Sequence, residues 1–378
     1  MVKPRSIFEE VAEEAQKTPS TSAGMISGDH KGSRKAISIW LSLLFVLVVL
    51  MVVIGGLTRL TDSGLSITEW NLIKGSIPPL NVADWDVVFE KYKKSPEFIL
   101  QNTGIMLDEF KTIYWWEWSH RQLGRFVGLV WAVGYLSFLL TKRIPRGWSL
   151  RLFFVGALGG LQGAIGWWMV SSGLTGRMVD VASYRLATHL GLAFIILGVI
   201  AWYMWQLNRE EHDLFQARRR ADIKLSLYGK ILIILVFFQI LLGALVAGID
   251  AGRGYIDWPM MNGEFLPSES FDYTPLWTNF FENPALVQFN HRILGYIIFL
   301  VALIVWFKSR ASALASIKRA FSMVMVAVLG QMVLGIGTVL YAAPWHIAII
   351  HQIGAIIVVI FTLNAIFSAA YPKAQSLR

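Results

Sequence analysis

The chain has 378 residues, of which 55% are hydrophobic and only 16% are charged. Soluble domains carry about 25% charged residues, so this composition indicates a membrane protein and excludes an ordinary soluble enzyme. The net charge of +9 fits basic cytoplasmic loops better than binding of nucleic acid, and the absence of cysteine excludes disulfides, iron–sulfur clusters and thioether-linked haem.

The first segment, residues 1–37, is polar, and residues 8–15 within it predict a short amphipathic helix. The segment is too acidic for a mitochondrial transit peptide, and it lacks the apolar core and cleavage site of a signal peptide. We therefore predict a cytoplasmic N-terminal tail on a bacterial protein.

Eight apolar stretches follow, each about long enough to cross a hydrocarbon core of about 30 Å. Because backbone polar groups in lipid must be paired internally, each stretch predicts a helix. The sequence therefore predicts an all-α polytopic membrane protein with eight transmembrane helices. The predicted spans are 38–57, 121–141, 152–171, 186–206, 228–248, 291–308, 319–340 and 347–368.

Lys and Arg decide the predicted orientation, because cytoplasmic loops of membrane proteins are enriched in both. With the N-terminus inside, most of the 34 Lys and Arg residues fall on cytoplasmic segments. We therefore predict that both termini are cytoplasmic, together with a linker of residues 207–227 and a tail of residues 369–378. The two long loops, residues 58–119 and 249–290, then face the outside.

The two halves of the chain repeat each other in the same helix order. The matched segments are 55–64 with 243–252, and Gln162-x-x-x-Gly166 with Gln331-x-x-x-Gly335. Because each repeat holds an even number of spans, both have the same orientation, related by a pseudo-twofold axis along the membrane normal. We predict two four-helix bundles, an N-terminal repeat of residues 38–206 and a C-terminal repeat of residues 228–368.

Four of the seven histidines occupy matched positions in the two repeats. His120 matches His291, each within His-Arg-x-Leu-Gly, and His189 matches His351. Polar groups at membrane depth are costly and usually functional, and two imidazoles on facing helices suit axial ligation of one haem iron. We therefore predict one haem site per repeat, rather than a zinc or di-iron centre.

Alternatives to this haem ligation stay open. The histidines can hydrogen-bond across helices instead. On the last helix His346 competes with His351, but its counterpart is Tyr184, whereas the counterpart of His351 is His189, so we favour His351. Glycines beside the sites, such as Gly159, fit either close helix packing or space for a flat macrocycle.

Arg121 and Arg292 each follow a matched histidine at the expected membrane surface. Arg is suited to pairing with carboxylates, and haem carries two propionates, so both are candidate haem-binding residues. Snorkelling of the side chain to the membrane interface explains them equally well.

The repeats differ three residues before their first histidine, where Glu117 stands in one repeat and Gln288 in the other. A carboxylate can transfer protons or stabilise a positive intermediate, whereas an amide can do only part of this. A Glu favoured by the helix dipole at a helix start is the alternative. We predict Glu117 as the catalytic residue, with chemistry in the N-terminal repeat and electron transfer in the C-terminal one. The acids repeated in both halves, including Asp62 and Asp250, are interpreted as structural.

Three motifs point to a known family. Residues 55–70 read Gly-Gly-Leu-Thr-Arg-Leu-Thr-Asp-Ser-Gly-Leu-Ser-Ile-Thr-Glu-Trp, residues 77–80 read Ile-Pro-Pro-Leu, and Glu117-x-x-His120-Arg121 follows. With these motifs the chain resembles the haem A synthase family of the proteobacterial and mitochondrial type, over essentially all residues after 38. Some members of that family carry a cysteine pair in the first outer loop, which this chain lacks.

The resemblance implies a protein of the bacterial inner membrane that oxidises the C8 methyl of haem O to a formyl group for cytochrome c oxidase. It implies that His120 and His189 flank the substrate haem. It also implies that His291 and His351 ligate a haem b cofactor and that Glu117 takes part in catalysis. The implied route passes through the alcohol and the gem-diol, with oxygen from water and electrons leaving through haem b.

The resemblance also implies partners: haem O synthase, the cytochrome c oxidase assembly machinery and an unidentified electron acceptor. A homo-oligomer is compatible with the sequence. Two other functions stay open, a di-haem b protein that oxidises quinol and a haem carrier without catalysis. Because a substrate haem must also leave, we expect either His120 or His189 to bind weakly, and the sequence does not decide which.

Overall fold

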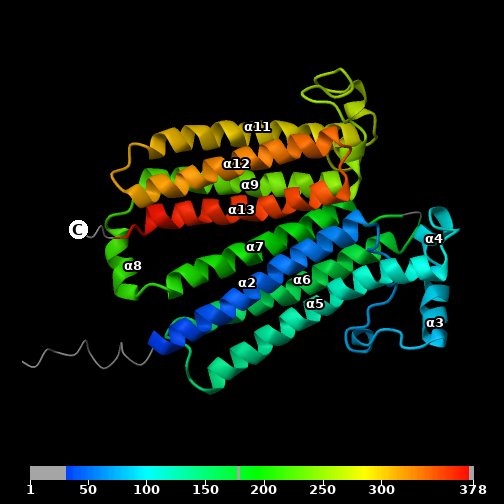
Figure 1. The fold of residues 1–378 in the computed structure, drawn as a ribbon, viewed down its shortest axis with the longest axis horizontal. Coiled ribbons are helices and arrows are strands. Elements are labelled where there is room, and N and C mark those ends of the chain that lie inside the picture. Colours follow the sequence, from blue (N-terminus) through cyan, green and yellow to red (C-terminus); the bar gives the residue numbers. More distant parts are fainter. Residues whose placement is uncertain (1–30, 177–178, 374–378) are drawn as a thin grey trace, which may run out of the picture.

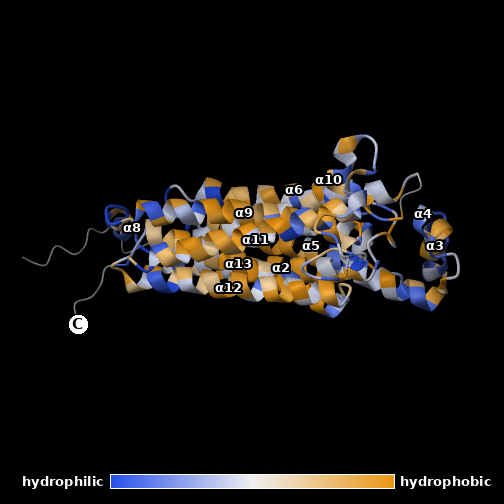
Figure 2. Cartoon of the chain, turned by 90° about the horizontal axis from the view of Figure 1, so that it is seen from above, coloured by the Kyte–Doolittle hydropathy of each residue, from blue (hydrophilic) through white to orange (hydrophobic). Residues whose placement is uncertain are grey.

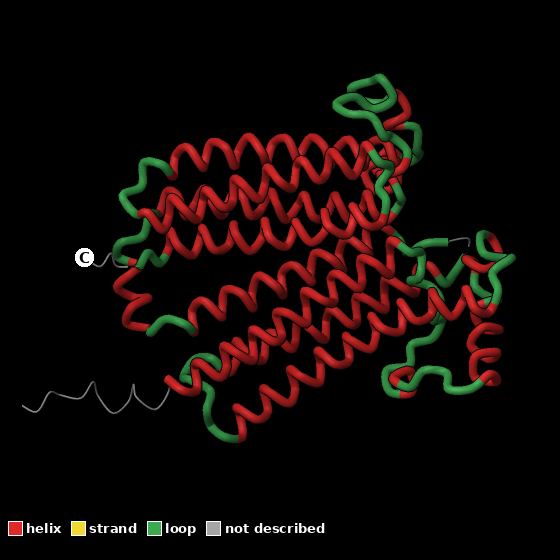
Figure 3. Tube along the Cα trace, in the orientation of Figure 1, coloured by secondary structure: helices red, strands yellow, loops and turns green. Residues whose placement is uncertain are grey.

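The computed structural model describes residues 31–176 and 179–373, which fold into helices and loops without a strand (Figure 3). Within them, eight helices are long and apolar enough to cross a membrane. These are α2 (Lys31–Leu60), α5 (Leu107–Leu140), α6 (Ser149–Gly173), α7 (Ser183–Leu207), α9 (Ile223–Gly248), α11 (Pro284–Ser309), α12 (Ala315–Leu340) and α13 (Trp345–Ala370). The prediction of an all-α membrane protein with eight spanning helices is confirmed. The helix predicted over 8–15 lies outside the described residues.

Shorter helices lie between the long ones. They are α3 (Val82–Tyr92), α4 (Pro96–Leu100), α8 (Glu211–Arg218) and α10 (Asn279–Glu282), with four 3-10 turns at Lys74–Ser76, Ala251–Arg253, Ser268–Phe271 and Leu276–Thr278. In the first outer loop, α3 and α4 cover the outer end of α5 through a small core of their own. That core contains the buried side chains of Phe89, Tyr92, Phe110 and Tyr114.

The predicted boundaries were wrong at several helix ends. The apolar run predicted a span from residue 121, but α5 begins at Leu107, because the aromatic side chains of its outer turns pack against the loop core. Likewise α11 begins at Pro284 rather than at 291, and α2 begins at Lys31, inside the predicted tail. His120 therefore lies well inside α5 and not at its outer end.

The long helices form two four-helix bundles, shown as separate layers in Figure 1. Within each bundle, neighbouring helices contact each other in a ring, α2–α5–α6–α7 in one and α9–α11–α12–α13 in the other. The bundles meet through α7 against α9 and α2 against α13. Helices that match in the repeat thus make matching contacts, and the pseudo-twofold axis itself stays a prediction.

Apolar side chains fill the interface between the bundles and also cover their outside. Buried residues of α2, α7, α9 and α13 belong to one continuous cluster, which includes Leu41, Leu197 and Leu232. On the outside of α5, Leu129 and Val133 are more than half exposed. Hydrophobic colours extend along the long helices in Figure 2, whereas hydrophilic colours gather at the two ends. This distribution is expected of helices surrounded by lipid.

The start of α2 and the end of α13 lie at one end of the bundles, and both long loops lie at the opposite end (Figure 1). Because the helices are longer than the predicted spans, the two outer loops are shorter than predicted and comprise residues 61–106 and 249–283. That the loop end faces away from the cytoplasm stays a prediction, since it rests on the distribution of Lys and Arg.

Candidate functional site

A cavity of about 910 Å³ lies among the long helices and reaches residues of both outer loops. Its lining comes from both bundles, and its volume is at the upper end of the range for binding sites of small molecules and cofactors. The four matched histidines, His120, His189, His291 and His351, all line it. The structure therefore brings the predicted ligands into one cavity, while ligation itself stays a prediction.

Each of these four histidine rings packs against a glycine of the preceding long helix. A Cβ placed on Gly55 of α2 would lie 2.6 Å from Cε1 of His120 on α5. The equivalent distances are 2.8 Å for Gly166 and His189, 3.1 Å for Gly243 and His291, and 3.0 Å for Gly335 and His351. Contacts this short leave little space for any side chain, so each imidazole is positioned by a glycine on its neighbouring helix.

Three of the four histidine segments are also held by a glutamine that lies one turn before the glycine. In each, Nε2 of the glutamine donates to the backbone carbonyl of the histidine, a contact that we call the glutamine tie. The ties join Gln162 to His189 (3.0 Å), Gln239 to His291 (2.9 Å) and Gln331 to His351 (2.6 Å). On α2 the corresponding residue is Met51. A Cβ placed on Gly124 would lie 3.6 Å from Cε of Met51, and a Cβ on the matching Gly295 would lie 3.3 Å from Nε2 of Gln239. A thioether has no hydrogen to donate, so His120 has no such tie.

The pair in the C-terminal bundle has the spacing that a shared iron requires. The ring centroids of His291 and His351 lie 6.5 Å apart, with an interplanar angle of 77°. A metal–imidazole bond is about 2 Å long and the ligating nitrogen lies about 1 Å from its ring centre, so two imidazoles on opposite sides of one ion have centroids roughly 6 Å apart. The observed separation is therefore close to that expected of two imidazoles on one haem iron, and the ligation itself stays a prediction.

The Nδ1 nitrogens of the four matched histidines are enclosed by protein atoms. The Nδ1 atoms of all four histidines are buried and have no hydrogen-bond partner within the described part of the chain. No group of three or more His, Cys, Asp or Glu side chains there can hold a bare metal ion. The described residues thus offer pairs of imidazoles and no larger cluster of ligands, which is the arrangement that predicted haem ligation would use.

The walls of the cavity differ between the bundles. A Cβ on Gly128, Gly159, Gly160 or Gly163 would meet nothing within 4 Å, and all four residues line the cavity. In the register of the matched histidines and glutamines, the corresponding residues of the C-terminal bundle are Phe299, Val328, Leu329 and Met332, of which Val328 and Met332 line the cavity. Close helix packing therefore does not explain these glycines, and they widen the N-terminal part of the cavity.

The carboxylate of Glu117 is buried, and each of its oxygens accepts two hydrogen bonds. Oε2 accepts from the hydroxyl of Ser66 and the amide of Ile67, both at 2.7 Å. Oε1 accepts from Nε and Nη2 of Arg121, at 3.1 and 2.6 Å. Since α5 begins at Leu107, Glu117 does not stand at a helix start, and the helix dipole does not account for it.

Gln288 makes the corresponding contacts without a charge. Its Nε2 donates to the carbonyl of Ala251 at 2.6 Å, and its Oε1 accepts from Nη2 of Arg292 at 2.6 Å. Both residues therefore anchor an outer loop to a helix. Only the N-terminal bundle places a carboxylate at this position of the cavity wall.

Arg121 and Arg292 hold matching carbonyls of the two outer loops. The acceptors are Ile67 (2.8 Å) and Glu69 (2.9 Å) for Arg121, and Tyr255 (2.9 Å) and Asp257 (2.9 Å) for Arg292. Snorkelling alone does not describe side chains with so many specific partners. Both guanidinium groups also line the cavity, so pairing with haem propionates stays a prediction.

An arginine joins the two bundles at the loop end. Nη1 of Arg59 lies 2.7 Å from Asp62 and 3.5 Å from Asp180, and its Nη2 lies 3.1 Å from Asp250. Asp62 and Asp250 are matched residues of the two repeats, so one guanidinium group pairs with both. This agrees with the interpretation of the repeated acids as structural.

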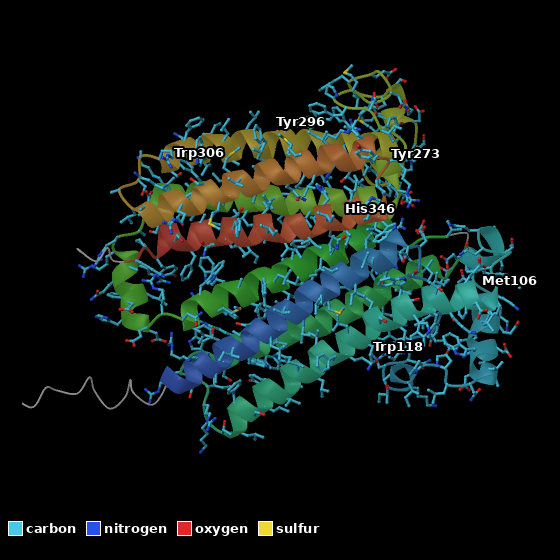
Figure 4. The ribbon with its side chains drawn as sticks, in the orientation of Figure 1. Met106, Trp118, Tyr273, Tyr296, Trp306 and His346 are labelled. Carbon is cyan, nitrogen blue, oxygen red and sulfur yellow. The ribbon has the colours of Figure 1, made fainter. Side chains whose placement is uncertain are left out.

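His346, the competing ligand on α13, lies apart from the cavity. Its side chain is exposed and its ring contacts Trp345 at a centroid distance of 5.7 Å. Figure 4 shows it near the loop end of α13. The cavity wall therefore includes His351 and not His346, while the choice of ligand stays a prediction.

Comparison with known proteins identifies the family of this chain. Residues 38–363 match the family described as "Cytochrome oxidase assembly protein". The chain belongs to that family. It is 60% identical to a "Heme A synthase" of Dinoroseobacter shibae, over 100% of this chain and 99% of that protein. It is 55% identical to a "Heme A synthase" of Ruegeria pomeroyi and 54% identical to one of Paracoccus denitrificans, over at least 98% of each protein.

Membership of the cytochrome oxidase assembly family confirms the resemblance predicted from the motifs. Together with the eight spanning helices, it identifies the chain as a multi-pass protein of the bacterial inner membrane. The single chain therefore presents both histidine pairs within one membrane-embedded cavity.

Sequence patterns missed three residues of this cavity. Gln239 repeats the spacing Gln-x-x-x-Gly of the other ties, and a search of α9 for that spacing would have found it. Met51 stands at the same place before Gly55, and only comparison of all four sites reveals it. Glu97 had no signal, because Ser95-Pro96-Glu97 has the pattern of an ordinary helix start.

Glu97 on α4 is a buried carboxyl group outside the spanning helices, and it lines the cavity. Its Oε2 has no hydrogen-bond partner in the described structure, and the hydroxyl of Tyr92 bonds to the carboxyl group. Burial raises the pKa of Glu97 to about 8, with smaller contributions from the charges of Glu117, Asp180 and Asp62. In the folded protein Glu97 therefore holds a proton that the unfolded chain releases at lower pH.

We expect Glu97→Gln to flatten the pH dependence of stability. Because the folded pKa of Glu97 lies above the unfolded one, the contribution of Glu97 to stability is fully present below about pH 4.5 and is lost as pH rises to about 8. The loss should reach roughly 2–4 kcal/mol at pH 8, and the neutral amide avoids it. Thermal unfolding in detergent at pH 5 and pH 8 measures this, with Glu90→Gln as the exposed control on α3. An equal fall in both variants would contradict it.

Proposed function

We propose that this protein is a haem A synthase, which oxidises the C8 methyl of haem O to a formyl group for the biogenesis of cytochrome c oxidase. The observation that carries the proposal is one cavity with two pairs of histidines, in a chain at least 54% identical to proteins named "Heme A synthase". It is then an oxidoreductase acting on a methyl group, with haem O as substrate and haem b as cofactor.

The N-terminal bundle is the proposed substrate half. Two features support this assignment. Glu117 provides a carboxylate there, and Gly128, Gly159, Gly160 and Gly163 leave open space on the cavity wall, whereas Val328 and Met332 line the cavity in the other bundle. A haem that must enter, react and leave needs that space, whereas a permanent cofactor does not. His120 and His189 would hold the substrate, and Arg121 is the proposed partner of its propionates.

The C-terminal bundle is the proposed cofactor half. His291 and His351 would hold haem b, with Arg292 near its propionates, and their spacing suits one iron between them. A haem b bound there supplies one-electron redox chemistry. The large side chains and the glutamine ties at both histidines suit a group that stays in place.

The proposed role of Glu117 follows from the protons and electrons that the overall reaction releases. Converting a methyl and one water to a formyl group releases four protons and four electrons, through the alcohol and the gem-diol. A buried carboxylate beside the substrate can accept protons or stabilise positive charge that develops on the carbon. Arg121, Ser66 and the amide of Ile67 hold this carboxylate in one orientation. The group is therefore preorganised, and little entropy is lost in orienting it during the reaction.

The remaining assignments are part of the same proposal. The bundles of residues 38–206 and 228–368 are the two functional halves, both termini are cytoplasmic, and the loops over the cavity face the outside. Haem O synthase would deliver the substrate, the oxidase assembly machinery would receive the product, and a further acceptor would take the electrons.

The test is to express the protein with haem O in a host that contains the electron partners, and to extract and weigh the pigments. We expect haem A, whose mass is about 14 units above that of haem O because CH3 becomes CHO. Cells without the protein should contain no haem A. Unmodified haem O alone would contradict the proposal and leave a haem carrier. Two tightly held haems b without haem O would instead indicate an electron-transfer protein.

A further inference from the structure

Among the four histidine positions of the cavity, His120 differs from the others in one contact. Gln162, Gln239 and Gln331 each tie the backbone of a histidine to the neighbouring helix. The residue in that place beside His120 is Met51. Glycine contacts the imidazole at all four positions, so the difference is confined to the tie.

The tie has a physical consequence for ligand exchange. A hydrogen bond between two helices in a membrane restrains both, because neither water nor lipid replaces the partner. In two sites the same amide nitrogen also lies 3.3 Å from the ring Nε2, a contact that a ligated Nε2 would have to give up, so only the bond to the backbone carbonyl counts as a restraint on a bound ligand. Methionine fills the space with a flexible thioether and makes no such bond.

The distribution of ties agrees with the two proposed halves. Both histidines of the cofactor half, His291 and His351, have a tie. In the substrate half His189 has one and His120 has none. A retained cofactor is thus held by two restrained ligands, whereas a substrate that must leave meets one restrained ligand and one unrestrained ligand.

We propose that Met51 makes His120 the exchangeable ligand of the substrate haem, and that Gln162 keeps His189 as the fixed one. This inference rests on the proposed function, since it requires a haem that is bound and then released from the N-terminal half. It assigns to Met51 a positioning role, because it acts through His120 and not on the reacting carbon.

The experiment measures the release of haem O from the full-length protein, loaded with haem O and haem b and mixed with excess apomyoglobin. Met51→Gln adds a donor where the other sites have one, and should slow haem O release by roughly 3- to 10-fold, the factor expected of one interhelical hydrogen bond. Met51→Leu changes the shape without adding a donor and should not slow release. Haem b retention reports that the variants are folded.

Two further variants make the test reciprocal. Gln239→Met removes a tie in the cofactor half and should speed haem b release by a similar factor. Gln162→Met should speed haem O release, and it carries the test if Met51→Gln does not accumulate. Equal haem O release in Met51→Gln and Met51→Leu, or unchanged release in Gln162→Met, would overturn the inference. A wild type that binds and releases haem O without converting it refutes the proposed function alone, whereas one that binds none refutes both.

Discussion

Replacing Glu117 with Gln should reduce formation of haem A by about 100-fold or more, the effect of losing a positioned acid–base group. The amide has nearly the shape of the carboxylate but no charge. The NH2 group of the amide would face a hydrogen-bond donor, either the backbone amide of Ile67 or the guanidinium group of Arg121, so one of these donors would lose its acceptor. The expected result is accumulation of haem O or of the alcohol, measured by mass after extraction of the pigments.

The same variant must be distinguished from a loss of folding. Haem b bound through His291 and His351 should be retained, because the hydrogen-bond partners of Glu117 are Ser66, Ile67 and Arg121. Glu117→Asp keeps the charge and should retain part of the activity. Glu109→Gln, an exposed carboxylate in the first turn of α5, is the matched control and should convert haem O normally. Loss of both haems in Glu117→Gln would indicate a purely structural role, and full activity would refute its catalytic role.

Replacing His351 with Ala should remove haem b, with its content falling at least 10-fold per protein. The reason is geometric, because His351 opposes His291 at the spacing that one iron requires and no other histidine of the described chain lines that half of the cavity. Haem b is measured by the absorbance of its pyridine complex and by mass after extraction.

His346→Ala provides the matched control on the same helix. It lies five positions earlier in the chain, with an exposed ring, and its replacement should leave haem b content unchanged. His291→Ala should show the same loss as His351→Ala, since each imidazole supplies one side of the pair. Retention of haem b in His351→Ala together with its loss in His346→Ala would show that the two histidines have been assigned in the wrong order.

The sequence predicted the elements that depend on local composition and repetition. Eight apolar runs predicted eight helices, because a spanning segment must pair its own backbone in lipid. The motifs from Gly55 to Trp70 and around His120 predicted the family, which the relatives confirm. The helix ends were less accurate. Aromatic packing against the first outer loop extends α5 outward to Leu107, and hydropathy carries no signal of that packing.

Glu117 shows where pattern and structure each contributed. The comparison of repeats identified this position, since Gln288 stands at the matching place. Two of the four donors around its carboxylate belong to Arg121, one turn later in the same local motif. The other two, the hydroxyl of Ser66 and the amide of Ile67, come from a loop some 50 residues away in the chain, and no local pattern contained them. Gly159, Gly160 and Gly163 of α6 are a second example. Their spacing fitted either close helix packing or space for a macrocycle, and the open space beside them in the structure argues against close packing.

By itself the sequence determined that this is an eight-helix membrane protein, and it predicted two repeats with four matched histidines and with Glu117 opposite Gln288. Hydropathy, charge and internal repetition are properties of the chain alone, and they suffice for those conclusions. The tertiary structure decided which side chains share the cavity, that Glu97 belongs to it, and that Met51 stands where three glutamines tie the other histidines. Those facts depend on contacts between helices, and the position of one helix against another is set by packing that no single segment encodes.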